Sequence, residues 1–170
     1  VEFFAGRSLQ GQPLHRDTLS DLMAFWIPPL GGGAVDPANF SARVTGVFTP
    51  AASGVHRVGV FAAGYAKVYV DGHLIANAWD GWRKGRTFFE EGCDEVVGEV
   101  TLTAGQAHQV VVEFCNKPAD NLVFAGLRVG IGRPLGDEDI AHAARVAAAA
   151  DRAVVFVGRS GEWDTEGSDL

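Results

Sequence analysis

Alternating apolar and polar residues dominate the first 131 positions of the chain. Residues 40–49 and 55–62 alternate most regularly, and a period of two predicts strands with two different faces. In the second of these runs His56 and Val58 fall on one face, whereas Arg57 and Phe61 fall on the other. The expected strands and apolar runs outside the hairpin described next cover residues 1–6, 22–27, 40–49, 55–62, 95–103, 108–115 and 122–131.

A hairpin is predicted near the middle of this strand-rich region. The pair Asp71-Gly72 lies between an alternating run that contains Val68 and Val70 and a second apolar run, Leu74-Ile75. Asp-Gly between two β-prone runs is a strong hairpin signal, because glycine tolerates the positive φ that a tight turn needs. We therefore expect the neighbouring strands to pair around residues 65–76.

The pattern changes after Pro134. Turn signals recur about every 8–12 residues up to that point, which favours a sandwich or barrel over βαβ units. Acidic residues 137–139 then precede an apolar stripe, so a helix is expected to end near Ala150. Residues 153–157 are continuously apolar and predict a buried parallel strand. The chain is thus expected to be mainly β over 1–133, with one helix-strand step of an α/β domain over 134–170.

Composition and charge narrow the classes of partner. The chain has 170 residues, 47% of them hydrophobic, which is enough for a packed core. Its formal net charge of −7 and pI of about 5.1 argue against nucleic acid or an anionic membrane surface as a binding partner, because both require a basic face. No apolar run reaches the roughly 18 residues of a membrane span. The start, Val-Glu-Phe-Phe, has no initiator Met and no signal-peptide pattern, so we expect a part of a longer protein.

Neither cysteine spacing nor histidine spacing indicates a metal site. Cys93 and Cys115 pair only if their strands are neighbours; we favour burial of both as small apolar side chains. Ca²⁺ takes six to eight oxygen ligands, the chain contains no Asp-Asp pair, and Asp71 is explained by its turn. We expect no metal and no cofactor. The five histidines without ligand spacing are His15, His56, His73, His108 and His142.

Two segments resemble known families. Residues 1–133 resemble a PA14 domain, a β-sandwich, through Ala66-Lys-Val-Tyr-Val-Asp-Gly72, Trp79 and Gly85-Arg-Thr-Phe-Phe-Glu-Glu-Gly92. Residues 134–170 resemble the start of the C-terminal α/β sandwich of family 3 glycoside hydrolases, through residues 154–169. In this order the segments resemble β-glucosidases with a PA14 insertion. The resemblance implies removal of terminal β-glucosyl residues with retention, and a catalytic nucleophile, an Asp, on a barrel domain outside this chain.

The terminal loop holds the candidate acid/base residue. Four carboxylates occur within eight residues, Glu162, Asp164, Glu166 and Asp169, after the predicted strand. Clustered like charges raise the pKa of one member, as an acid catalyst at neutral pH requires; a solvated acidic loop is the alternative. The family resemblance assigns the acid/base role to Glu162 within Ser160-Gly161-Glu162, with Glu166 as runner-up. Leu170 departs from the family pattern, which continues with Arg.

Aromatic residues are the candidates for contacts with substrate. Trp79, Trp82, Phe88 and Phe89 fall within eleven positions, and aromatic faces stack on sugar rings. In an extended chain Phe88 and Phe89 would point to opposite sides, so one of them is expected in the core. The resemblance implies that this domain closes the leaving-group subsites. Phe88, Phe89, Trp82 and Trp163 are therefore the predicted substrate-binding residues.

Two functions remain open. The first is part of a retaining exo-acting β-glucosidase that binds a β-glucoside or a short oligosaccharide and works with the rest of a parent glycosidase chain. The second is a non-catalytic carbohydrate-binding PA14 module. Residues 136–170 favour the first, because a binding module has no use for a helix-strand step that ends in an acidic loop. Leaving group, linkage, oligomeric state and compartment are not determined by the sequence.

Overall fold

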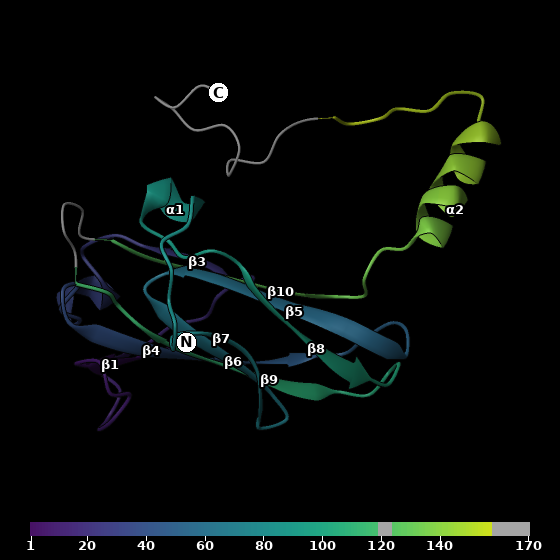
Figure 1. The fold of residues 1–170 in the computed structure, drawn as a ribbon. Helices are drawn as coiled ribbons and strands as arrows, with labels where there is room; N and C mark the ends of the chain where they lie inside the picture. Colours follow the sequence, from purple (N-terminus) through teal and green to yellow (C-terminus); the bar gives the residue numbers. More distant parts are fainter. Residues whose placement is uncertain (119–123, 158–170) are drawn as a thin grey trace.

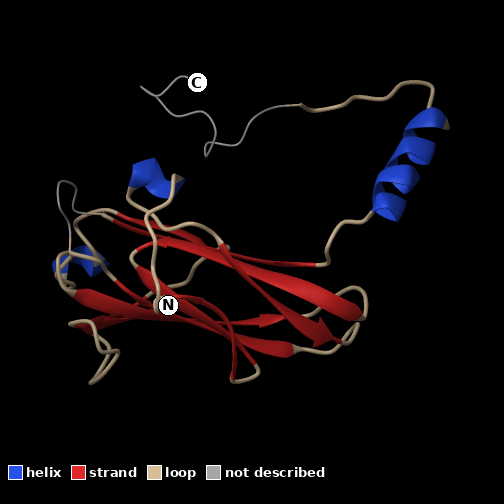
Figure 2. Ribbon diagram, viewed as in Figure 1, coloured by secondary structure: helices blue, strands red, loops and turns tan. Residues whose placement is uncertain are grey.

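Two antiparallel sheets lie face to face (Figures 1 and 2). The computed structural model describes residues 1–118 and 124–157. In this part of the chain the larger sheet has the order β2 (His15–Arg16), β1 (Glu2–Ala5), β4 (Phe40–Phe48), β9 (His108–Cys115), β6 (Tyr65–Val70), β7 (His73–Ala78). The smaller sheet has the order β3 (Met23–Trp26), β10 (Ala125–Gly132), β5 (Gly54–Ala63), β8 (Val96–Leu102). The predicted mainly β sandwich is confirmed.

The core lies between the two sheets, where alternate positions of their strands meet. His56, Val58 and the other even positions of β5 up to Ala62 are buried on the inner face, as the alternation predicts. At one end of the core Trp26 packs edge-on against Phe40 and Phe114, with ring centroids 5.9 and 4.9 Å apart. Such aromatic pairs add about 0.5–1.5 kcal/mol each beyond the burial of their area.

The predicted hairpin joins β6 to β7. Asp71 and Gly72 have φ of 49° and 79°, the left-handed values that a primed two-residue turn requires. Val70 pairs with His73 across the turn. The Asp71 carboxylate also accepts a hydrogen bond from the backbone N–H of Gln109 over 2.8 Å. The turn is therefore attached to the start of β9 as well as closing its own hairpin.

Both cysteines are buried and unpaired in the structure. Cys93 lies in the core, where its Sγ accepts a hydrogen bond from the backbone N–H of Ala62 over 3.3 Å. Burial raises the pKa of the Cys115 thiol to about 11. The favoured interpretation, two small buried side chains, is confirmed.

The segment after β10 contains the predicted helix, α2 (Asp137–Ala148), and its described residues up to 157 form no strand. Asp139 caps the helix by accepting a hydrogen bond from the N–H of Gly136 over 2.9 Å, and its carboxylate pairs with Arg133. The strand expected over residues 153–157 is absent, and Phe156 is 94% exposed. A parallel strand needs neighbours for its hydrogen bonds, and the described residues place none beside it. No helix in the described parts of the chain is long and apolar enough to span a membrane.

Candidate functional site: an aromatic patch on the smaller sheet

Aromatic side chains gather on the outer face of the smaller sheet. Phe25 comes from β3, Phe61 from β5, Phe88 and Phe89 from the short turn α1 (Thr87–Glu90), and Phe124 directly precedes β10. Ring centroids of Phe25 lie 6.1 Å from Phe88, 6.3 Å from Phe89 and 5.1 Å from Phe124. Phe61 joins the group through Phe88 at 5.5 Å. We call these five residues the aromatic patch.

The turn that carries two of these rings has an unusual backbone. Phe88, Phe89 and Glu90 have φ of 51°, 57° and 64°, so three consecutive residues other than glycine are left-handed. This conformation costs about 1–2 kcal/mol per residue. A hydrogen bond joins the segments before and after the turn: the N–H of Gly85 donates to the carbonyl of Gly92 over 2.8 Å. Strained backbone of this kind persists only where surrounding contacts hold it.

Neither phenylalanine of the turn lies in the core between the sheets. Phe88 is half-buried against the outer face of the smaller sheet, and Phe89 is 69% exposed. The expectation that one of them is a core residue is therefore wrong. That expectation assumed an extended chain, in which adjacent side chains point to opposite sides. In the left-handed turn both rings instead point to the same outer face of the smaller sheet.

The patch offers aromatic faces with a positive charge at one edge. Phe25 is 41% exposed although it belongs to a paired strand. The guanidinium carbon of Arg128 lies 5.9 Å from the centre of the Phe61 ring. Exposed aromatic faces bury the C–H surfaces of a sugar ring or a planar group with little loss of side-chain entropy. The arrangement can bind and orient such a group, and it contains no acid–base pair.

Trp82 belongs to a different aromatic group. Its ring centroid lies 6.2 Å from that of Tyr65, and the Lys117 ammonium nitrogen lies 4.8 Å from the centre of the Trp82 ring. The indole Nε1 is buried and has no hydrogen-bond partner among the described residues. Trp79 packs on the same tyrosine at 6.0 Å and is half-buried. The structure therefore does not bring Trp82 together with Phe88 and Phe89.

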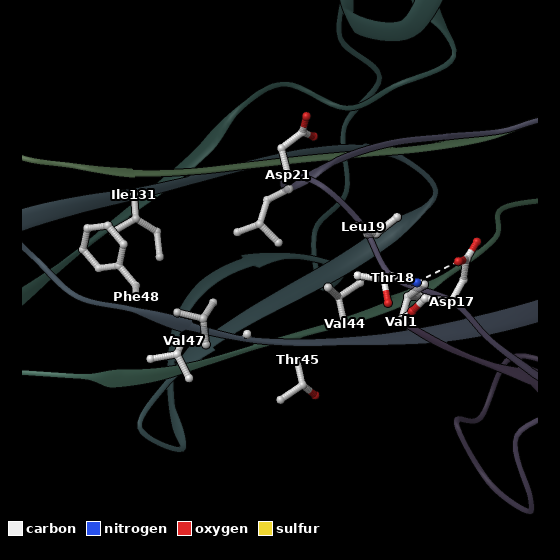
Figure 3. Close-up of a pocket in the computed structure, with 13 residues that line it drawn as sticks. Val1, Asp17, Thr18, Leu19, Asp21, Val44, Thr45, Val47, Phe48 and Ile131 are labelled. Atoms are coloured by element: carbon white, nitrogen blue, oxygen red, sulfur yellow. Dashed lines mark hydrogen bonds between the residues drawn. The ribbon is translucent and has the colours of Figure 1, made fainter.

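A hollow with a volume of about 490 Å³ opens between the two sheets, and Figure 3 draws the residues that line it. Apolar side chains that include Leu19, Val44 and Ile131 line it. Two carboxylates stand at its rim, but each caps a local turn. Asp17 accepts from the N–H of Thr18 over 2.7 Å, and Asp21 accepts from the N–H of Met23 over 2.8 Å. We therefore regard this hollow as an unfilled end of the sandwich core.

Several predicted site residues lie outside the described residues. These are Glu162, Trp163 and Glu166, all in the segment 158–170. Their roles, and their distances from the aromatic patch, stay predictions. Within residues 1–118 and 124–157 no three His, Cys, Asp or Glu side chains come together as metal ligands. The absence of a Ca²⁺ site thus also stays a prediction, which a binding measurement checks.

Sequence reasoning missed Phe25, Phe61 and Phe124 as members of a site. Their alternation assigns each to a strand or its edge, but it does not tell which strands pair. In the observed register Phe25 lies opposite Gly126, a position without a side chain, and the Phe88 ring occupies the gap. A glycine inside a predicted strand is the one sequence signal that could have indicated this close approach.

Comparison with known proteins identifies one domain family and a set of similar enzymes. The PA14 domain family matches residues 1–143. A β-glucosidase of Rhizobium radiobacter is 42% identical over 172 residues, which cover all of this chain and 21% of the relative. A probable β-glucosidase I of Aspergillus clavatus is 40% identical over 139 residues, 76% of this chain and 17% of the relative.

One solved structure extends the likeness to three dimensions. The crystal structure of a β-glucosidase from Kluyveromyces marxianus in complex with glucose superposes with a TM-score of 0.81 at 27% identity. The match covers 98% of this chain and 20% of that one. The chain thus spans about a fifth of the length of the relatives that it matches.

Proposed function

The chain belongs to the PA14 domain family, and from that premise we propose that it works as part of a retaining exo-acting β-glucosidase of glycoside hydrolase family 3. Its relatives named β-glucosidase, at 42% and 40% identity, support this proposal. In the proposed enzyme the glucosyl unit is removed from the end of a β-glucoside or a short oligosaccharide. The leaving group of that substrate is the part that this chain contacts.

The observation that carries the proposal is the exposed aromatic patch. Phe25 and Phe89 expose much of their rings on an outer sheet face, although burial would stabilise both. In Figure 1 the turn α1 and the helix α2 lie on the same side of the smaller sheet, away from the larger sheet. The patch therefore faces the side on which the chain leaves the sandwich through α2. We assign Phe88 and Phe89 to a wall of the leaving-group subsites.

The second part of the proposal concerns acid catalysis. We assign the general acid/base role to Glu162 in the terminal loop, with Glu166 as the alternative. Retaining glycosidases use one carboxyl group as acid/base and a second as nucleophile. We place the nucleophile on a separate barrel domain of the parent enzyme, so this chain contributes one half of the catalytic pair.

Substitution of the exposed phenylalanine tests the proposed wall. In the complete enzyme, Phe89→Ala should lower kcat/KM for a β-linked glucose trisaccharide about twofold to tenfold relative to methyl β-glucoside, since one aromatic contact contributes ~0.5–1.5 kcal/mol. Methyl β-glucoside is the internal control, because its leaving group is too short to reach a wall. Phe88→Ala should act in the same direction.

A matched variant separates this effect from the general effect of removing an exposed apolar side chain. Val47 is 72% exposed on the larger sheet, so Val47→Ala removes an exposed apolar side chain far from the patch and should leave the substrate ratio unchanged. If neither phenylalanine variant changes the ratio, the patch is not part of the leaving-group subsites.

A carbohydrate-binding module without catalysis is the alternative function. It is favoured by one feature: the aromatic patch is complete within the described residues and needs no other domain to form. Under this alternative the 170-residue chain alone binds oligosaccharides, and Phe89→Ala weakens that binding. Titration of the chain with a glucose trisaccharide distinguishes the two, because a wall that covers only one side of a leaving group gives no measurable affinity by itself.

A further inference from the structure

Gly126 is the second residue of β10 and lies on the outer face of the smaller sheet. Its neighbours across the strands are Phe25 on β3 and Ala63 on β5. A Cβ atom at this position would come within 2.6–2.8 Å of three atoms of the Phe88 ring, whereas an ordinary contact is 3.4–4 Å. The Phe88 ring therefore rests directly on the bare Cα of Gly126.

The Phe88 ring also anchors the left-handed turn to the smaller sheet. Phe88 contacts Phe25 and Phe61 from above, so its ring fills the gap between those two side chains. The next residue, Phe89, follows in the same left-handed conformation and contacts Phe25 at 6.3 Å. Three strained residues in sequence leave little freedom to the turn. The height of the Phe88 ring above the sheet therefore determines where the Phe89 ring lies.

We propose that Gly126 is a positioning residue that sets the place of Phe89 in the leaving-group subsites by letting the Phe88 ring lie against the sheet. The proposal rests on the proposed function for its catalytic consequence. Its structural part concerns the turn alone and can be tested separately. A side chain at Gly126 would have to lift the Phe88 ring, and the turn would move with it.

The chain contains a matched control for this substitution. Gly130 lies on the same strand and the same outer face, two alternate positions further along, and an added Cβ there meets nothing within 4 Å. Neither glycine has a positive φ, so alanine is compatible with both backbones. Gly126→Ala and Gly130→Ala therefore make the same chemical change, and differ in whether the Phe88 ring must move.

The first measurement follows the turn in the complete enzyme. Chymotrypsin cleaves after phenylalanine, so a displaced turn should be cut after Phe88 or Phe89 faster in Gly126→Ala than in the parent or in Gly130→Ala. The melting temperature of each variant reports whether it is folded. In a Phe88→Leu background, Gly126→Ala should not increase cleavage over Phe88→Leu alone, because the smaller side chain leaves room for the new Cβ.

The second measurement follows substrate preference. Gly126→Ala should lower kcat/KM for the trisaccharide about twofold to tenfold relative to methyl β-glucoside, mainly through a higher KM, because the lost contact stabilises ground state and transition state alike. Gly130→Ala should change kcat/KM for neither substrate. Because Phe88→Leu itself alters the proposed wall, the double variant is compared with Phe88→Leu alone, and in that background Gly126→Ala should have little effect.

The outcomes separate the two proposals. Equal cleavage of the two alanine variants, or an effect of Gly126→Ala that is the same with and without Phe88→Leu, would overturn the positioning role. Faster cleavage of Gly126→Ala with an unchanged substrate ratio would support the positioning of the turn and overturn the assignment of Phe89 to the leaving-group subsites.

Discussion

Asp71 shows how one turn residue connects three strands. Its positive φ closes the β6–β7 hairpin, its N–H donates to the carbonyl of Gln109, and its carboxylate contacts the Nδ1 of His108 at 2.7 Å. These contacts hold the pKa of Asp71 below its usual value, first through His108 and then through the N–H of Gln109. The sequence identified the turn, but it did not indicate that the side chain reaches the start of β9.

The Asp71 contacts make stability depend on pH. A carboxylate whose pKa is lower in the folded state stabilises the protein above its unfolded pKa, near 4, and that stabilisation is lost as the pH falls through the folded pKa. Asp71→Asn should therefore lower the melting temperature at pH 7, and the difference from the parent should shrink toward pH 2–3. Thermal unfolding across this range measures it. A constant difference at all pH values would contradict the ionic part of this account.

A second substitution controls for the loss of one negative charge. Asp151 is exposed and lies beyond the sandwich, so Asp151→Asn should leave the melting temperature nearly unchanged at both pH values. If it matches Asp71→Asn, net charge rather than the turn contacts explains the effect.

The residues of the patch mark where sequence reasoning ends. Phe88 and Phe89 were identified as candidates because aromatic residues in a loop suggest contacts with sugar. Their real orientation depends on three left-handed residues, and ordinary side chains carry no sequence signal for that conformation, unlike glycine. Phe25 was assigned to an apolar run, and only the register of β3 against β10 shows which way its ring points.

At the scale of elements, prediction worked where a period of two sets both the strand and its buried face. The strand predicted over residues 40–49 is β4, and the strand predicted over residues 108–115 is β9. Prediction failed where an element depends on partners. Residues 153–157 have the composition of a buried strand, yet they are exposed here because nothing pairs with them in the described residues.

Gly98 on β8 is required by the contact between the edges of the two sheets. An added Cβ would lie 1.9 Å from the carbonyl oxygen of Ile75 on β7, so the strands could not approach as they do. Gly98→Ala should lower the free energy of unfolding by about 1–3 kcal/mol, the usual cost of overpacking. Urea titration measures it. Gly46→Ala is the control, because a Cβ at Gly46 on β4 meets nothing within 4 Å.

At the scale of the whole molecule, the sandwich and the tail have different requirements. The sandwich buries a core of its own, whereas α2 buries none of its residues. The predicted division at residues 133 and 134 stays a prediction, and the PA14 match runs past it to residue 143. An amphipathic helix with no covered face is stabilised by packing against a partner, which the described residues do not supply.

The 170-residue chain alone should therefore be inactive. The proposed mechanism needs a nucleophile that we place on another domain, and an acid without a nucleophile and without a closed site does not cleave a glycoside. The purified chain should release no more nitrophenol from an aryl β-glucoside than buffer does. Turnover that disappears in Glu162→Gln of the same chain would show that it holds a complete site, and would overturn the assignment of the nucleophile to a barrel domain.

The identity of the acid decides whether the terminal loop is catalytic. A general acid matters most when the leaving group is a poor one, so in the complete enzyme its loss should reduce kcat on such a substrate by about 10²–10⁴-fold. An aryl β-glucoside with a good leaving group should be affected far less. Glu162→Gln should show this pattern, and Glu166→Gln, four residues further along the same loop, is the matched comparison. If only Glu166→Gln shows it, the proposed family mechanism stands with a different residue as acid. If neither does, the loop has no acid role, and the carbohydrate-binding module becomes the better account of the exposed aromatic patch.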